Sequence, residues 1–190
     1  MLRLWTVGHS TRTLEELIGI LAAHRIEWLA DVRSVPRSRR HPCFDRATLP
    51  GPLGRAGIGY SHEPGLGGLR RPRADSTNLG WQNPGFRGYA DHMETDEFER
   101  HFGALMARAA AARLTVMCAE AVPWRCHRSL IADAATARGI EVRHILTAGE
   151  ARPHRMTPFA RVSDGRVRYP GLAHGSTDGG IPPDRLDRSS

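Results

Sequence analysis

The stretch Arg113–Asp133, RLTVMCAEAVPWRCHRSLIAD, decides how the rest of the chain is arranged. Its apolar run Leu114–Met117 is short and contains β-branched residues, which predicts a buried strand. Pro123 prevents one continuous helix, so a loop must separate this strand from a helix that opens near His127 or Ser129. A strand, a loop and a helix in this order are typical of α/β sheets, in which ligands bind at the carboxyl ends of the strands.

Strand and helix signals alternate on both sides of this stretch. Apolar runs predict strands at residues 2–7, 28–32, 58–62, 114–117 and 141–146, with helical spacing or helix caps between them. This alternation predicts one domain over residues 1–162, a three-layer α/β/α sandwich around a mostly parallel five-stranded sheet. Residues 163–190 are polar and rich in Gly and Pro, which predicts a loosely ordered C-terminal tail.

The composition is that of a soluble globular protein, with 40% hydrophobic and 6% aromatic residues. No apolar run approaches the roughly 20 residues of a transmembrane helix, so no membrane segment is expected. The opening residues MLRLWTVGHS lack the apolar core of a secretory signal, and the 3 widely spread cysteines do not form a disulfide framework. A cytoplasmic location is therefore expected.

All 27 basic residues of the chain are arginine, and the net charge is +7. A positive charge of this size ordinarily indicates a nucleic-acid or phosphate partner. The absence of lysine, with abundant Ala, Gly and Pro, indicates a bias of the whole coding sequence. The positions of the arginines are therefore more informative than their number, and they concentrate in loops that follow predicted strands.

Polar side chains follow four of the predicted strands. Because the carboxyl ends of parallel strands lie at one edge of a sheet, these side chains are expected to line one shared pocket. The groups are His9 with Ser10, Asp31 with Arg33, His62 with Glu63, and Cys118 with Glu120.

Five motifs stand out along the chain: GHSTR at 8–12, LADVRSVPRSRR at 29–40, NPGFRGYADHM at 83–93, MCAEAVPWRCHRSLIAD at 117–133 and PHRMTPFARV at 153–162. Together they resemble the motifs of the bacterial domain of unknown function 488 family. The resemblance covers roughly residues 1–162 with the motifs in the same order. It implies an α/β domain and no particular reaction, since the activity of the family is unassigned.

The candidate catalytic residues are Cys118, His9, Asp31 and Glu120. A cysteine between a strand and a helix N-terminus has the layout of rhodanese-like and tyrosine-phosphatase sites, where a nearby arginine stabilises a thiolate. The spacing from Cys118 to Arg125 is longer than in the phosphatase loop, and the glycines of that loop are missing. The alternative is that Cys118 is a small buried residue that finishes the strand.

The expected ligand bears a phosphate group, because helix N-termini and guanidinium groups both bind phosphate. The residues expected to hold it are Ser10, Arg33, Arg37, Arg125, His127, Arg128 and Ser129. The alternatives are a solvated arginine run inflated by composition, and a structural ion pair of Arg128.

The main functional hypothesis is a hydrolase or transferase that binds a nucleotide or nucleic-acid end in this cleft. The first alternative is a non-catalytic nucleic-acid binding module, in which Trp81, Phe86 and Tyr89 stack bases instead of forming a small core of their own.

The second alternative is a metal-binding regulatory protein. Cys118, Cys126 and His127, with His9 or His62, offer soft ligands. The two cysteines are further apart than in the paired motifs of structural zinc sites, so no residue is assigned to a metal. The sequence identifies neither a cofactor nor an oligomeric state.

Overall fold

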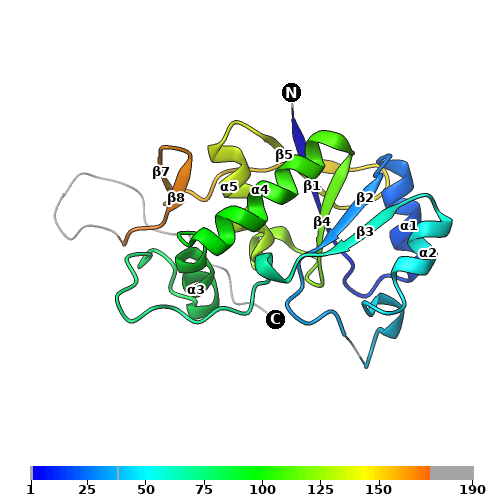
Figure 1. Ribbon diagram of the computed structural model, residues 1–190, viewed down its shortest axis with the longest axis horizontal. Coiled ribbons are helices and arrows are strands. Elements are labelled where there is room, and N and C mark those ends of the chain that lie inside the picture. Colours follow the sequence, from blue (N-terminus) through cyan, green and yellow to red (C-terminus); the bar gives the residue numbers. More distant parts are fainter. Residues whose placement is uncertain (1, 38, 172–190) are drawn as a thin grey trace, which may run out of the picture.

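The computed structural model describes residues 2–37 and 39–171 (Figure 1). Its main sheet has the strand order β3-β2-β4-β1-β5-β6. The strands are β1 (Arg3–Gly8), β2 (Trp28–Asp31), β3 (Gly59–His62), β4 (Leu114–Cys118), β5 (Glu141–Ile145) and β6 (Ala151–Pro153). The first five strands are parallel, which confirms the predicted α/β fold and its five strands. The antiparallel β6 was not predicted, because its residues have no apolar pattern and pair with β5 through backbone bonds.

Five α-helices connect these strands, and their ends follow local capping signals. They are α1 (Leu14–Ala23), α2 (Pro50–Arg55), α3 (Pro84–His92), α4 (Asp96–Ala111) and α5 (Arg128–Ala137). Thr13 and Glu16 form the predicted capping box of α1. Gly139, with φ +76°, ends α5 in the left-handed conformation that glycine adopts without strain. Short 3₁₀ turns add η1 (Pro42–Phe44), η2 (Pro64–Leu66) and η3 (Pro123–Arg125).

The two faces of the sheet bury separate hydrophobic clusters, because alternate strand residues point to opposite sides. In β4, Val116 packs into the cluster beneath α3, α4 and α5, whereas Met117 packs into the cluster beneath α1 and α2. Helix α4 lies in front of the sheet in Figure 1. Helices therefore cover both faces, as the three-layer prediction requires.

A second sheet is formed by the hairpin of β7 (Arg161–Ser163) and β8 (Arg166–Arg168). Val167 and the fully buried Tyr169 pack into the cluster under α5, so ordered structure continues past residue 162. The remainder of the expected tail, residues 172–190, lies outside the described residues. Among the described residues, no helix has both the length and the apolar character to cross a membrane.

Candidate functional site

The polar ends of the parallel strands meet at one edge of the sheet. In the strand register, Gly8 is opposite Cys118, and Asp31 is opposite both Met117 and His62. Beyond β1, the backbone N–H of His9 donates to the Cys118 carbonyl at 3.0 Å, so the pairing continues into the loop. A Cβ atom on Gly8 would lie 2.0 Å from the Glu120 carbonyl oxygen, so this close approach requires glycine.

Two adjoining hollows open at this edge. The first, which we call the thiol cleft, has a volume of about 410 Å³ and is lined by Arg33, Ser34, Val35, Gly68, Leu69, Asn83, Gly85, Phe86, Cys118, Ala119, Glu120, Arg125, Cys126 and His127. The second, which we call the His9 pocket, has a volume of about 530 Å³ and is lined by His9, Ser10, Thr11, Arg33, Val35, Arg37, His41, Ala119, Glu120 and Ala121. The hollows share Arg33, Val35, Ala119 and Glu120, so they are neighbouring parts of one recess.

Three soft donor atoms converge on the thiol cleft. The Nδ1 atom of His127 lies 3.7 Å from the sulfur of Cys126 and 4.0 Å from the sulfur of Cys118. All three atoms lie within 4.8 Å of one another. The strand end, the loop after η3 and the residue before α5 each supply one donor, so the convergence depends on how the loop folds back.

The contact made by Nε2 of His127 determines the tautomer of the neutral ring. Nε2 lies 3.2 Å from the carbonyl oxygen of Val32, which accepts hydrogen bonds and cannot donate them. The proton of the neutral ring is therefore on Nε2, and the lone pair of Nδ1 points toward the sulfurs. Metal-binding histidines are commonly fixed in the same way by a backbone carbonyl. Gly68 allows the ring this position, because a Cβ atom there would lie 2.4 Å from Nδ1.

Both sulfur atoms also accept hydrogen bonds from the protein. Cys118 accepts from the backbone N–H of Glu120, and Cys126 accepts from Nε of Arg128 at 3.4 Å. The hydrogen bond with Cys118 and the positive charge of Arg128 lower the pKa of Cys126. The same hydrogen bond with Cys126, together with burial, raises the pKa of Cys118. The pair therefore holds one thiolate readily, and a second one requires an additional positive charge nearby.

The spacing of the three donors matches that of zinc ligands. Zinc–sulfur bonds of about 2.3 Å and zinc–nitrogen bonds of about 2.05 Å at tetrahedral angles separate sulfur from nitrogen by about 3.6 Å. The observed separations are 3.7 and 4.0 Å. Since all three residues line the thiol cleft, a metal ion among them would keep one coordination position open to it. The residues Cys118, Cys126 and His127 can therefore hold a metal ion.

Asp31 and Arg33 form a buried ion pair. Arg33 donates from Nε to one oxygen of Asp31 at 2.8 Å and from Nη2 to the other at 2.6 Å. The same Nη2 donates to the Phe44 carbonyl, and the hydroxyl of Tyr60 donates to Asp31. Both residues are at most 7% exposed. Most of their hydrogen-bonding capacity is used inside the protein, so the pair has a structural role beside the recess.

His9 is also held by internal contacts. Its Nδ1 donates to the Ser10 carbonyl at 3.0 Å, its Nε2 accepts from Arg33 at 3.3 Å, and its ring stacks on Phe44. Burial and the charge of Arg33 lower its pKa to about 4. The imidazole is therefore neutral near pH 7. Ser10 and the exposed Arg37 line the same His9 pocket.

The arginines expected to bind the anion differ in exposure. Arg128 is 1% exposed, and its guanidinium donates to Cys126 and to the carbonyl oxygens of Glu120 and Ala121, so it clamps the loop from inside. Ser129 donates its hydroxyl to the Cys126 carbonyl at 2.9 Å. Arg125 is exposed and lines the thiol cleft, where its charge faces solvent and ligand.

Aromatic residues at and before the start of α3 pack inside the protein. Trp81 stacks on Phe86 with a centroid separation of 4.7 Å and also contacts Phe159 and Tyr169. Tyr89 is fully buried, and its hydroxyl donates to the Leu66 carbonyl. Tyr89 thus belongs to the hydrophobic cluster beneath α3, α4 and α5, and Trp81 and Phe86 pack against that cluster. Trp124, by contrast, is 67% exposed. The sequence analysis did not select it as a site residue, and the only sequence signal for such a role is its position beside Arg125.

The fold and the site define an α/β protein with a thiol–imidazole cluster at the carboxyl ends of its parallel strands. The family model described as "Domain of unknown function DUF488" matches residues 13–135, which is more than half of the chain. The chain therefore belongs to this family. Neither the curated proteins nor the solved structures include a match.

Proposed function

We propose that the protein is a zinc-dependent hydrolase in which Cys118, Cys126 and His127 hold the metal at the floor of the thiol cleft. The observation that supports this most strongly is the convergence of their donor atoms at 3.7 and 4.0 Å, beside a ligand-sized hollow. Thiolate and imidazole donors together favour zinc over magnesium or calcium, which prefer oxygen. Three protein ligands with one open position are typical of catalytic zinc sites.

The cleft also supplies a candidate general base. Glu120 follows Cys118 by two residues and lines both the thiol cleft and the His9 pocket. A zinc ion lowers the pKa of a bound water, and zinc deaminases combine such a site with a glutamate that is not a ligand. In the proposed hydrolysis Glu120 takes a proton from water, the water oxygen bonds to the electrophilic atom, and the leaving group receives the proton as its bond breaks.

We propose a phosphate-bearing ligand for this cleft, with Arg125 as its main charged contact. Arg125 is the exposed guanidinium among the lining residues, since the other arginine there, Arg33, is paired with Asp31. A charge-assisted hydrogen bond contributes about 1.5–3 kcal/mol, so one contact supports roughly a tenfold change in affinity. Arg37, in the adjoining His9 pocket, offers a second charge for a longer ligand.

The metal is tested on purified protein kept under reducing conditions. Elemental analysis should find close to one zinc ion per chain, and replacement by cobalt should give the absorption of a cobalt–thiolate bond. Cys118→Ser, Cys126→Ser and His127→Ala should each lose most of the metal. Cys43→Ser is the matched control, because Cys43 is a free cysteine outside the cleft and should leave zinc content unchanged.

Metal content that stays the same in all three variants, or wild-type protein that binds neither zinc nor cobalt, would overturn the proposed metal centre. Cobalt that binds without a thiolate band would show that the sulfurs are not ligands.

The ligand is tested by titrating nucleoside monophosphates against the wild type and Arg125→Ala. The variant should bind roughly tenfold more weakly, with unchanged zinc content. Arg55→Ala, at an exposed position on α2, is the control and should bind like the wild type. Equal affinity of wild type and Arg125→Ala would remove Arg125 from the proposed ligand site.

A further inference from the structure

The side chain of Trp124 is exposed next to a buried residue. It is 67% exposed, although the preceding Pro123 is buried, and no aromatic ring within residues 2–37 and 39–171 stacks on it. Burying an aromatic side chain stabilises a folded protein, so leaving this one in water forgoes that stabilisation. Trp124 also lines a cavity, so its exposed ring is placed where it can contact a ligand.

Trp124 borders a third hollow, which lies beside the thiol cleft. This tryptophan cavity has a volume of about 650 Å³ and is lined by Trp81, Pro123, Trp124, Ser129, His144, Leu146, Arg152, Pro153, His154, Arg155, Thr157 and Pro158. Residues Trp124 and Arg125 are adjacent on η3, but the first lines the tryptophan cavity and the second lines the thiol cleft. The 3₁₀ turn is therefore the wall between the two hollows.

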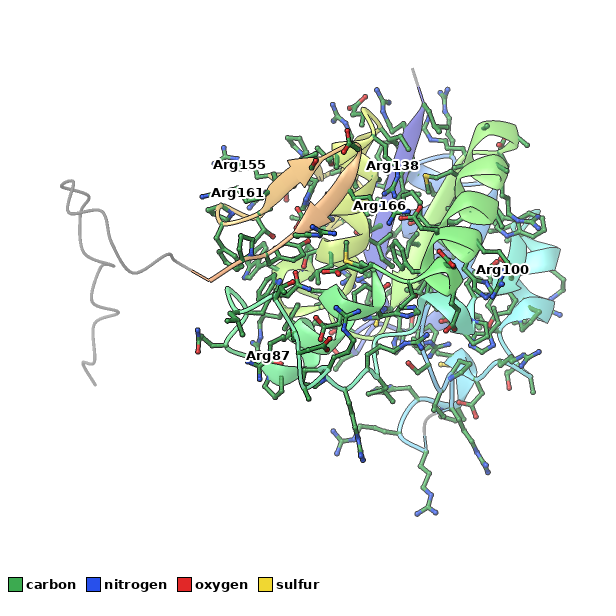
Figure 2. All side chains as sticks on the ribbon, turned by 60° about the vertical axis from the view of Figure 1, so that its left-hand side comes forward. Arg87, Arg100, Arg138, Arg155, Arg161 and Arg166 are labelled. Carbon is green, nitrogen blue, oxygen red and sulfur yellow. The ribbon has the colours of Figure 1, made fainter. Side chains whose placement is uncertain are left out.

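Positive charge continues on the far side of the tryptophan cavity. Arg152 and Arg155 line it and are exposed; Arg152 pairs with Glu150 at 2.7 Å, whereas no ion pair joins Arg155 to a described residue. The chain then leads from Arg155 to the β7–β8 hairpin. In the view of Figure 2, Arg155 and Arg161 appear at the same edge of this hairpin.

The outer face of the hairpin places like charges opposite each other. Arg161 is the direct cross-strand partner of Arg168, and Arg166 is the partner of Ser163. The intervening Val167 is buried under α5, so these arginines point away from the core. Like charges in direct cross-strand contact are destabilising. Glu94 lies 4.0 Å from Arg168 and offsets little of this repulsion, which an anionic partner would relieve.

We propose that Trp124, Arg155 and the outer face of the hairpin form a binding track for a single-stranded nucleic acid whose end enters the thiol cleft. A base stacks on Trp124, its phosphate reaches Arg125, and phosphates further along the strand contact Arg155 and the hairpin. The assignment of the strand end as substrate rests on the proposed hydrolase function. Binding of the strand to the track does not require the metal.

Single-stranded nucleic acid fits this surface better than a duplex does. Stacking on Trp124 requires an unpaired base with an open face, which a base inside a duplex lacks. Base–aromatic stacking strengthens binding whichever base is present, because every base has a π-face. The arginines along the track supply the electrostatic part of the affinity.

The test measures fluorescence anisotropy of labelled oligothymidylates about four to sixteen nucleotides long. Affinity should rise with length and exceed that for thymidine monophosphate and for a duplex of equal length. Trp124→Ala should weaken binding about tenfold, and Trp124→Phe should keep most of the affinity because it preserves a stacking face. In the double variant Arg161→Ala/Arg166→Ala, log affinity should decrease less steeply with log salt concentration. The magnitude of the slope should be smaller by about 1.4, which is about 0.7 for each phosphate that the protein no longer neutralises.

Arg55→Ala serves as the control for loss of one positive charge, and zinc content is measured in every variant. Unchanged affinity in Trp124→Ala with zinc retained would overturn the track and leave the metal centre standing. Equal binding of monophosphate and oligomer, tighter binding of duplex, or a salt slope unaffected by the hairpin variant would also overturn it. Trp124-dependent binding by protein that holds no zinc would support the track and refute the hydrolase.

Discussion

Two clusters of polar side chains that include histidine lie against helix α5, and they differ in how tightly their polar atoms are bonded inside the protein. Along the side of the helix, the buried Asp133 accepts from Nε2 of His154 at 2.8 Å, from the backbone N–H of Thr157 at 3.0 Å and from the Tyr169 hydroxyl at 2.7 Å. At the start of the helix, the atoms of Cys118, Cys126 and His127 face one another across longer gaps.

The Asp133 network, which comprises Thr6, Asp133, His144, His154, Thr157 and Tyr169, is closed. Nε2 of His144 lies 2.9 Å from Nδ1 of His154, and Nδ1 of His144 lies 2.8 Å from the Thr6 hydroxyl. Every ring nitrogen therefore has a partner at hydrogen-bond distance. Although His144 and His154 line the tryptophan cavity, no nitrogen is left to act on a ligand. The network fastens the segment after β6 to α5.

The thiol cluster differs in that its internal contacts are longer. Its separations of 3.7 and 4.0 Å suit a shared metal ion better than strong hydrogen bonds, and its atoms line a cleft. The presence of histidine and charge therefore does not distinguish a support from a site. What distinguishes them is whether the polar atoms are already held by short hydrogen bonds inside the protein.

The largest effect on stability is expected for Asp133→Asn. The substitution removes the carboxylate that three donors share and puts an amide N–H₂ among them, so the unfolding free energy should fall by roughly 3 kcal/mol. Urea denaturation measures the change. A loss below about 1 kcal/mol would mean that the Asp133 network does not hold the segment after β6 against α5. Zinc content of the folded variant should stay at the wild-type level.

Arg128→Ala should have the next largest effect, because Arg128 belongs partly to each region. Its loss leaves the buried carbonyl of Glu120 without its partner, so we expect a loss of stability of roughly 2–3 kcal/mol. Zinc affinity should also fall, since Cys126 loses the donor that supports its thiolate. Unchanged melting temperature with weakened binding of nucleoside monophosphate would instead make Arg128 a direct ligand contact.

Acid should weaken the Asp133 network through His144. Burial and the neighbouring His154 and Arg128 lower the pKa of His144 from 6.5 to about 3, and Asp133 opposes this shift. Below pH 6.5 the His144 side chain binds a proton in the unfolded chain but stays neutral in the folded protein. The free energy of unfolding therefore decreases as the pH falls from 6.5 toward 3. The stability difference between the wild type and His144→Gln should shrink over this range. A constant difference from pH 7 to pH 5 would contradict the depressed pKa.

The smallest effect on stability is expected for Arg125→Ala at the edge of the thiol cleft. Its side chain is exposed, so the unfolding free energy should change by less than about 0.5 kcal/mol. A melting curve measures this, with Arg55→Ala as the reference for loss of an exposed arginine. A much larger loss would show that Arg125 has a structural role and would blur the contrast between the two regions.

The sequence alone determined the layout of the fold. Short apolar runs, the capping residues Thr13 and Glu16, and the stop at Gly139 are local signals, and each depends on neighbours within a few positions. The parallel arrangement then required the polar strand ends to meet at one edge. For that reason His9, Asp31 and Cys118 could be placed together from the sequence.

The tertiary structure decided which of these groups is available for chemistry. The hydrogen bonds from Tyr60 to Asp31 and from His127 to Val32 join parts of the chain that no local pattern relates, and the loop before α5 turns Arg128 inward. The spacing from Cys118 to Cys126 looked too wide for a metal in the sequence, yet the loop brings both sulfurs to the same imidazole. Whether a buried polar atom finds an internal partner depends on long-range packing, and that packing separates the ligands of a site from its supports.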